Sequence, residues 1–428
     1  MKKTGLFLAF ALLAAGTASA QKKHFDYKFY GQIRTDLFYN SRSNSETVDG
    51  LFYMYPKDEA RDPNGEDLNG IPSGNFYTLY TRLGVDVKGP KLGHGIRPSA
   101  KVEVDFRGSG TSYSTVRIRH AYFNLDFKKH SSLLVGQTWH PLYGDVAPDI
   151  MNLNMGAPYQ PFSRAPQARY RFHKKKFQLT AVAIWQSQYL AVGPADNKAG
   201  TVDTKKSQDF LKNSLTPEFY LGLDYKTPNL LAGVGLEMMS MTPRTTSIVG
   251  ATDDFKGTEY RVHERITSLS YEAHVKYQKE SFLLAAKSVL GSNLTQTSTM
   301  GGYGITDIDP VTGEQEYTPL KTSHTWVNVM YGKKLRGGLF GGYLKNLGAT
   351  KELKYGVLST GYNLETDTNL DQLATVSAEI SYNLPNWKFG LEYSYCNAWY
   401  GSNDEKGKVV DTHRVDNHRI VAVALFQF

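Results

Sequence analysis

The chain has 428 residues, of which 40% are hydrophobic and 13% aromatic, and its formal net charge is +8 at pH 7. Its 39 Gly, 28 Tyr and 21 Phe favour strands and turns, and no apolar run after residue 20 has the length of roughly 20 residues that a membrane-spanning helix needs, which excludes a helical membrane protein. The single cysteine, Cys396, excludes an intramolecular disulfide and a thiolate metal cluster.

Residues 1–20 have the features of a secretory signal peptide. Lys2 and Lys3 form the positive start, Gly5 to Ala15 form the apolar centre, and Ala18-Ser19-Ala20 forms an A-x-A cleavage site. We expect cleavage before Gln21, which removes two lysines and lowers the formal charge from +8 to +6. Residues 21–428 are then expected to form a single domain.

The first mature segment, Tyr27 to Asn40, alternates between apolar and polar residues as a strand does. One face carries Tyr27, Phe29, Ile33, Leu37 and Tyr39, and the other carries Lys28, Gln32, Arg34 and Asp36. This pattern is typical of a barrel strand with its apolar face outward. A soluble β-sandwich has the same period and turns its apolar face to a packed core, so this segment alone leaves both folds open. A long polar segment follows, up to Asn75.

The next two predicted strands carry charges on their polar faces. In Tyr77 to Lys88, the residues Tyr77, Leu79, Leu83, Val85 and Val87 oppose Tyr80, Arg82, Asp86 and Lys88. In Ser99 to Arg107, the residues Ala100, Val102, Val104 and Phe106 oppose Lys101, Glu103, Asp105 and Arg107. A face with this many charges does not fit a soluble core. It fits the water-filled lumen of a barrel.

The same reading predicts thirteen further strands, for a total of sixteen. They are Thr115 to Phe127, Ser132 to Trp139, Ala168 to Phe172, Phe177 to Tyr189, Glu218 to Lys226, Leu230 to Met241, Arg265 to Tyr277, Ser281 to Leu290, Ser323 to Lys333, Gly337 to Leu347, Gln372 to Leu384, Trp387 to Tyr400 and His418 to Phe428. In the last strand, Ile420, Ala422, Ala424, Phe426 and Phe428 share one face. A strand ending on Phe is typical of outer-membrane barrels, in which the last strand pairs with the first.

Short and long connections alternate along the chain. Short turns follow the even-numbered strands, whereas nearly all long segments follow odd-numbered strands, as at Leu190 to Leu215, Thr242 to Glu264, Gly291 to Thr322, Gly348 to Asp371 and Gly401 to Val415. Outer-membrane barrels have this asymmetry between periplasmic turns and extracellular loops. The sequence therefore predicts an all-β fold, a closed antiparallel transmembrane β-barrel of about sixteen strands in the outer membrane of a Gram-negative bacterium. Such a barrel encloses an aqueous channel.

Two stretches resemble the DcaP-like family of Gram-negative porins: Val116 to Leu125 (VRIRHAYFNL) and Leu134 to Pro141 (LVGQTWHP). The resemblance covers about a quarter of the chain. It implies a homotrimer of sixteen-stranded channels for small, often anionic solutes, with Arg117 and Arg119 lining the pore. Some members carry a heptad-repeat segment before the barrel; here the first strand follows soon after the expected cleavage site.

The long segment His140 to Gln167 occupies the place of the third long loop of general porins, which folds into the barrel. By this resemblance we expect residues 140–167 to constrict the pore, with Asp145, Asp149 and Arg164 among the loop's charged residues. Five prolines stiffen the segment and its apolar side chains can pack on the barrel wall. A loop on the outer surface is the alternative.

The predicted function is a porin, a passive channel for small hydrophilic solutes that favours anions such as small carboxylates. The candidate pore-lining residues are Arg34, Arg82, Lys101, Arg107, Arg117, Arg119, Arg169 and Arg171, because rings of Arg or Lys select anions. Inward acidic residues oppose them, so a transverse field and simple lumen ion pairs remain alternatives. A solute-specific channel, or a plugged barrel that acts as a surface binding or adhesion protein, also remains open.

Other chemistry has weaker support in the sequence. Asp62 to Gly70 and Asp307 to Gly313 are acidic loops in which bound calcium is conceivable, but Val311 stands where an oxygen ligand is wanted; we expect no other cofactor or metal. The eleven histidines follow no nucleophile or zinc spacing, so no enzyme is expected. The lysines near the short turns explain the basic balance without nucleic acid. The expected partners are small solutes, outer-membrane lipid and two further copies of the chain.

Overall fold

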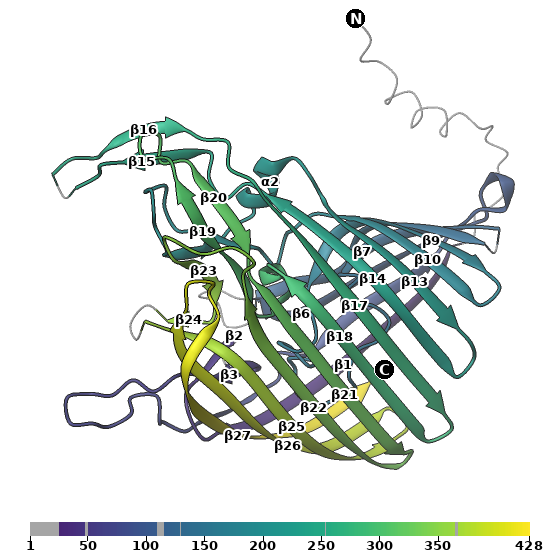
Figure 1. Ribbon diagram of the computed structural model, residues 1–428. Coiled ribbons are helices and arrows are strands. Elements are labelled where there is room, and N and C mark those ends of the chain that lie inside the picture. The colour runs from purple at the N-terminus through teal and green to yellow at the C-terminus, as the bar shows by residue number, and fades with distance from the viewer. Residues whose placement is uncertain (1–24, 48–49, 109–114, 129, 253, 364–366) are drawn as a thin grey trace, which may run out of the picture.

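The computed structural model describes residues 25–47, 50–108, 115–128, 130–252, 254–363 and 367–428. The signal peptide predicted for residues 1–20 lies outside the described residues. Within them, the main sheet is a closed antiparallel β-barrel of sixteen strands, which confirms the fold predicted from the sequence (Figure 1).

The barrel strands follow one another in chain order around the sheet. One of them is interrupted and consists of β4 (Ser73–Tyr77) and β5 (Arg82–Lys88). The others are β1 (Asp26–Asn40), β6 (Arg97–Gly108), β7 (Thr115–Phe127), β8 (Ser131–Trp139), β9 (Arg164–Lys174), β10 (Phe177–Ile184), β13 (Glu218–Lys226), β14 (Leu230–Met241), β17 (Ile266–Lys279), β18 (Phe282–Ser292), β21 (Lys321–Gly332), β22 (Leu335–Gly348), β25 (Thr368–Leu384), β26 (Trp387–Asn403) and β27 (Val409–Gln427).

The first and last strands close the barrel. β1 pairs with β27 from Gln32 opposite Gln427 to Asn40 opposite Arg419, and it pairs with β4 and β5 on its other side. Phe428 continues this seam, because its backbone N–H and C=O both bond to Gly31, at 3.1 and 2.9 Å. A Cβ atom at Gly31 would lie 2.6 Å from the Phe428 ring, so this position needs glycine.

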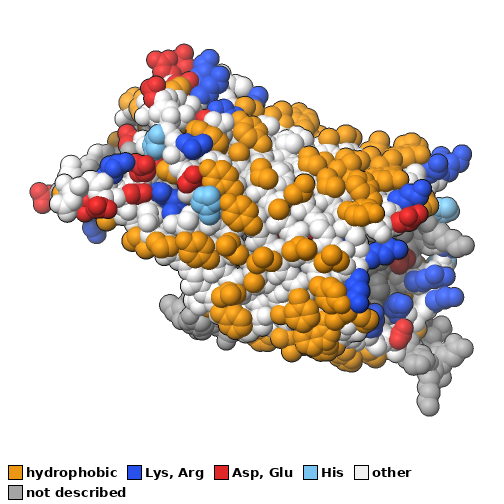
Figure 2. All heavy atoms as spheres, turned by 90° about the horizontal axis from the view of Figure 1, so that it is seen from below, with side chains coloured by type: hydrophobic (Ala, Val, Ile, Leu, Met, Phe, Trp, Pro, Cys, Tyr) orange, Lys and Arg blue, Asp and Glu red, His pale blue; other side chains and the backbone are white. Residues whose placement is uncertain are grey.

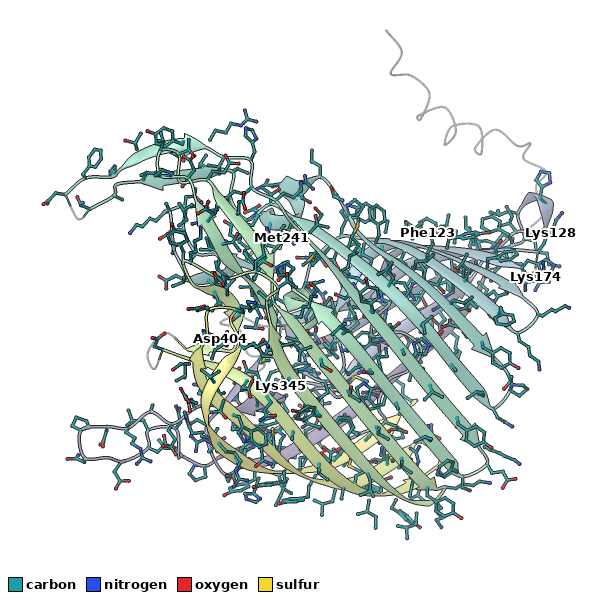
Figure 3. All side chains as sticks on the ribbon, viewed as in Figure 1. Phe123, Lys128, Lys174, Met241, Lys345 and Asp404 are labelled. Atoms are coloured by element: carbon teal, nitrogen blue, oxygen red, sulfur yellow. The ribbon has the colours of Figure 1, made fainter. Side chains whose placement is uncertain are left out.

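The two ends of the barrel differ. Short turns join β7 to β8, β9 to β10, β13 to β14, β17 to β18, β21 to β22 and β25 to β26, and Lys128 and Lys174 lie at this end (Figure 3). Asp404 lies at the opposite end, where the long connections gather (Figure 3).

Smaller elements lie in the connections: β2 (Asn44–Thr47), β3 (Phe52–Pro56), η1 (Gly93–Gly95), β11 (Val192–Pro194), β12 (Thr204–Lys206), α2 (Asp209–Ser214), β15 (Thr246–Val249), β16 (Thr258–Arg261), η2 (Thr295–Thr297), β19 (Gly301–Ile308), β20 (Gln315–Pro319), β23 (Val357–Thr360) and β24 (Tyr362–Asn363).

The outer surface of the barrel is apolar between two charged ends (Figure 2). Outward side chains such as Phe29, Leu339, Val376 and Leu391 are at least half exposed in the isolated chain. This band is where hydrocarbon covers an outer-membrane barrel. Among the described residues, no helix is long and apolar enough to cross a bilayer.

The second predicted strand differs most from the structure. Residues 78–81 form a turn closed by a hydrogen bond from the Thr81 N–H to the Thr78 carbonyl, at 3.2 Å. The turn breaks the alternation, so Tyr77 points into the lumen opposite Asp36 and Phe76 points outward. The prediction that Tyr77 shares the outer face with Leu83 was therefore wrong.

Several predicted boundaries were also wrong. β10 ends at Ile184 rather than Tyr189, and β9 begins at Arg164, so the loop predicted for residues 140–167 spans residues 140–163. β26 ends at Asn403 rather than Tyr400 and β27 begins at Val409 rather than His418, which reduces the predicted segment Gly401 to Val415 to residues 404–408. Pairing between neighbouring strands extends β9, β26 and β27 into polar stretches in which period-two alternation is weak.

The difference between the two ends of the barrel leads to a prediction: cysteines placed at opposite ends should differ in their labelling on intact cells. In a Cys396→Ala background, which removes the single buried cysteine, we expect K351C in the β22–β25 connection to react with a membrane-impermeant maleimide. The matched variant K175C, in the β9–β10 turn, should react only after the outer membrane is opened. Labelling of K175C but not of K351C would invert the orientation.

Candidate functional site

The loop of residues 140–163, between β8 and β9, lies inside the barrel. Its apolar side chains Leu142, Met151, Leu153, Tyr159 and Phe162 are all buried. Tyr159 packs in one cluster with Trp326, Phe340 and Leu373 of β21, β22 and β25, and Met151 and Leu153 pack in another with Val421 and Val423 of β27. The loop therefore contacts the wall opposite the strands that carry it.

Backbone hydrogen bonds hold the middle of this loop. The Met151 N–H donates to carboxylate oxygens of Glu392 and Glu379, at 2.7 and 3.0 Å, and the Asn152 N–H also donates to Glu392, at 3.2 Å. On the other side, Arg34 donates to the Met151 carbonyl at 2.5 Å. Three strands, β1, β25 and β26, thus fix one peptide segment through a guanidinium and two carboxyl groups.

Two glycines on the inner wall make room for the loop. A Cβ atom at Gly342 of β22 would lie 2.4 Å from the Tyr159 ring, and one at Gly390 of β26 would lie 2.2 Å from the Met151 side chain. Real Cβ atoms do not approach this closely, so the wall at these two positions is shaped to receive the loop.

The two acidic loop residues that the sequence singled out are both paired with basic residues. Asp145 lies 3.2 Å from Arg171 and from Lys226, and Asp149 lies 2.6 Å from Arg336. Burial alone would raise the pKa of Asp145, but Arg171 and Lys226 together hold this pKa below its usual value. The negative charges of the loop are therefore offset where they meet the wall.

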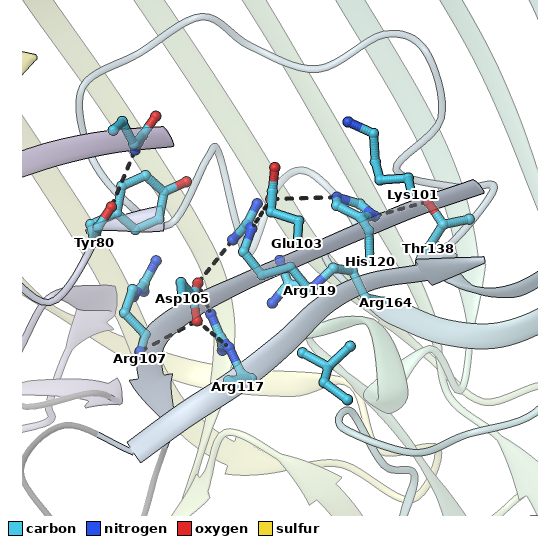
Figure 4. A network of polar contacts seen from close by, with 12 residues as sticks. Tyr80, Lys101, Glu103, Asp105, Arg107, Arg117, Arg119, His120, Thr138 and Arg164 are labelled. Atoms are coloured by element: carbon cyan, nitrogen blue, oxygen red, sulfur yellow. Dashed lines mark hydrogen bonds and ion pairs between the residues drawn. The ribbon is translucent and has the colours of Figure 1, made fainter. Parts of the chain in front are cut away.

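Strands β6 and β7 bring together the pore-lining arginines that the resemblance implied (Figure 4). Arg117 bonds to Asp105 through two nitrogens, at 2.8 and 3.0 Å, and Arg119 bonds to Glu103 at 2.5 Å and to Asp105 at 3.1 Å. A β-bulge opposite Glu103 and Val104 directs both Arg119 and the adjacent His120 inward. Ile118 and Phe123 therefore point outward, and the bulge explains the mixed pattern of this strand.

The other predicted pore-lining residues fall into two groups. Arg34 is paired with Asp36, Lys101 with Asp86 and Arg171 with Asp145. Among the described residues, no carboxylate forms an ion pair with Arg82, Arg107 or Arg169. Arg164, which was predicted as a loop residue, is the first residue of β9. Within the described part of the chain it too forms no ion pair with a carboxylate.

Aromatic rings lie beside three of these arginines, Arg82, Arg107 and Arg164. The Arg82 guanidinium lies 4.0 Å from the centre of the Tyr80 ring, and the Arg164 guanidinium lies 4.7 Å from that of Trp139. The Nε atoms of Arg82, Arg107 and Arg164 are buried without a hydrogen-bond partner within the described part of the chain. The wall at β5–β9 thus carries positive charge that nearby acids do not cancel.

A cavity of about 800 Å³ opens among the long connections. Its lining includes Arg107 and Arg117 at the loop ends of β6 and β7, with Lys205, Lys206, Phe52 and Tyr189 from the connections. Arg107 and Arg117 thus belong both to this cavity and to the group of arginines on β6 and β7.

The sequence reading missed several residues that hold the loop: Lys226, Arg336, Glu379 and Glu392. Alternation within β25 and β26 places both glutamates on the inner face, but only the register shows that they lie directly opposite each other. The partners of the loop were not predictable because they depend on how a segment without periodicity crosses the lumen.

The two acidic loops considered for calcium use their carboxylates in turns. Asp62 accepts the N–H groups of Asn64 and Glu66 at 2.9 Å, and Asp309 accepts those of Val311 and Thr312 at 3.0 and 2.7 Å. Among the residues that the structure describes, no three His, Cys, Asp or Glu side chains are grouped to hold a metal ion.

A closed sixteen-stranded barrel with an inward loop and a charged inner wall defines the class of outer-membrane porins. Solved structures of this class have the same fold at low sequence identity. The outer membrane channel DcaP of Acinetobacter baumannii has a TM-score of 0.62 at 16% identity, covering 96% of this chain and 99% of that one. OmpT of Vibrio cholerae has a TM-score of 0.52 at 12% identity, covering 96% of this chain and 100% of that one. An anion-selective porin from Comamonas acidovorans has a TM-score of 0.50 at 10% identity, covering 95% of this chain and 100% of that one.

Residues 10–198 match the model of the DcaP outer membrane protein family, which confirms the resemblance seen in the sequence. The matched part contains β1 to β10, the inward loop and the arginine wall. A search of curated protein sequences returned no match. Together, the fold and the family match indicate an outer-membrane porin channel, and neither points to an enzyme.

The hydrogen bonds to Met151 lead to a prediction about the loop. E392A leaves the Asn152 N–H without its acceptor and the Met151 N–H with Glu379 alone, and an unpaired buried donor costs about 1–3 kcal/mol. We expect a looser loop, seen as a higher and noisier single-channel conductance in planar bilayers. The matched variant E405A, in the exposed β26–β27 connection, should behave as wild type. Equal traces for E392A and wild type would show that Glu392 does not hold the loop.

Proposed function

We propose that the chain is a passive diffusion channel for small hydrophilic solutes that favours anions, with small carboxylates as the preferred class. The observation that carries this proposal is the charge imbalance of the inner wall. Arg82, Arg107, Arg164 and Arg169 lack a carboxylate partner within the described residues, whereas the loop acids Asp145 and Asp149 are paired. Fixed positive charge along a narrow aqueous path favours anions.

The loop of residues 140–163 is proposed to form the constriction. Tyr159 of the loop packs against β21, β22 and β25, while Met151 and Leu153 pack against β27 and also against Tyr80 beside the arginine wall. The path that this leaves would run along the arginine wall. The basic residues that are paired with acids would then shape the electrostatic field along this path; they are Arg34, Lys101, Arg117, Arg119 and Arg171. The arginines without a carboxylate partner would make that field positive.

Two further features belong to the proposal. The resemblance to the DcaP-like family favours a homotrimer in outer-membrane lipid, delivered there after removal of residues 1–20. A plugged barrel that acts at the cell surface is the competing function, since the loop buries much of the lumen's inner face. Stable ion-conducting steps in a planar bilayer favour the channel; a silent barrel would favour the plug.

A measurement of ion selectivity in a planar bilayer tests the proposed preference for anions. The wild-type reversal potential across a KCl gradient should have the sign of anion selectivity. R117Q/R119Q removes two positive charges and leaves Glu103 and Asp105 without their arginine partners, so we expect the anion-to-cation permeability ratio to fall several-fold.

The control for this test is R61Q, which removes a largely exposed arginine in the β1–β4 connection and should leave the ratio unchanged. Cation selectivity of the wild type, or an unaltered ratio in R117Q/R119Q, would contradict the proposed anion preference.

A further inference from the structure

Tyr80 lies at the break in the second barrel strand. The turn of residues 78–81 directs its side chain into the lumen, where the residue is only 4% exposed. Two hydrogen bonds fix the backbone: the Tyr80 carbonyl accepts from Gln32 Nε2 at 3.1 Å, and the hydroxyl of Thr81 donates to the Thr78 carbonyl at 2.9 Å. The ring is therefore held by its backbone and does not depend on a polar contact of its own.

Four guanidinium groups surround this one ring. Arg82 lies 4.0 Å from the ring centre, and Arg107, Arg34 and Arg119 lie at 5.0, 5.1 and 5.7 Å. They come from β1, β5, β6 and β7, so positively charged side chains from four successive strands of the wall lie around the ring. Figure 4 shows Tyr80 beside Arg107, Arg119 and Asp105.

Like charges gathered in this way repel one another, so something must hold them. Arg34 and Arg119 are held by Asp36, Glu103 and Asp105. Arg82 and Arg107 have no ion pair among the described residues, and the Tyr80 ring is their shared neighbour. The face of an aromatic ring attracts a guanidinium through its quadrupole but carries no net charge.

This difference matters for a channel. A carboxylate at the position of Tyr80 would hold the arginines and also cancel their field, whereas the ring holds them and leaves the field in place. We propose that Tyr80 is a positioning residue that keeps Arg82 and Arg107 in the lumen as uncancelled charges and thereby sets the anion selectivity of the pore. This inference rests on the proposed function.

The Tyr80 hydroxyl offers a matched control. Its contact within the described residues is with the Met155 sulfur at 3.8 Å, so Y80F keeps the ring and loses little. Y80L removes the ring and keeps an apolar side chain. Without the ring, Arg82 and Arg107 are free to turn toward Glu103 and Asp105, which lie on the same wall.

The test compares reversal potential, conductance and heat-modifiable migration for wild type, Y80F and Y80L. We expect Y80F to match the wild type and Y80L to lower the anion-to-cation permeability ratio about two- to fivefold, the factor equivalent to one cation–π contact. The heat-modifiable barrel band should persist. If Tyr80 had only a structural role, Y80L would change the heat-modifiable band and the conductance but would not lower the anion-to-cation permeability ratio.

The outcomes separate the two proposals. An anion-selective wild type with equal ratios in Y80F and Y80L would overturn the role of Tyr80 and leave the proposed function standing. A wild type without anion selectivity would overturn both. Y80Q is a second ring-free variant in case Y80L forms no barrel, and a Y80Q barrel with the ratio of Y80F would likewise contradict the inference.

Discussion

The structure depends on one constraint: within a membrane, every backbone N–H and C=O group must find its partner inside the protein. An unpaired group in hydrocarbon costs several kcal/mol, so a sheet can cross only if it has no free edge. The seam between β1 and β27 meets this requirement, and the bonds between Phe428 and Gly31 extend it to the last residue. Once the sheet closes, alternate side chains must face lipid and lumen, and this alternation separates the apolar outer band from the charged inner wall.

The inner wall then divides into two regions with different chemistry. On the β21–β27 side, apolar side chains receive Tyr159, Met151 and Leu153 of the inward loop, and Glu379 and Glu392 accept its backbone N–H groups. On the β5–β9 side it carries arginines whose neighbours are acids or aromatic rings. Because the loop's own acids are paired with basic residues, the loop adds little negative field. The division of the lumen, rather than a count of charged residues, supports the proposed preference for anions.

Much of this could be predicted from the sequence, because alternation is a local property. Sixteen strands and the split between turns and loops followed from period-two patterns and from connection lengths. The last strand carries apolar residues on both faces, and the loop explains them: Val421 and Val423 point inward and pack on Met151 and Leu153, whereas Ile420 faces out. The inward turn of Tyr77, the bulge at Arg119 and the grouping of four arginines on Tyr80 depend on strand register, which the sequence does not encode locally.

The central claim is that the loop lies across the lumen and leaves the arginine wall as the path for solutes. The most direct measurement uses Y159C/G342C in a Cys396→Ala background, because Gly342 lies against the Tyr159 side chain and a disulfide needs Cβ atoms about 3.5–4.5 Å apart. We predict that this disulfide forms under mild oxidation, and that conductance and reversal potential are the same before and after reduction. Failure of the cysteines to pair, or a several-fold change in conductance on reduction, would contradict the account.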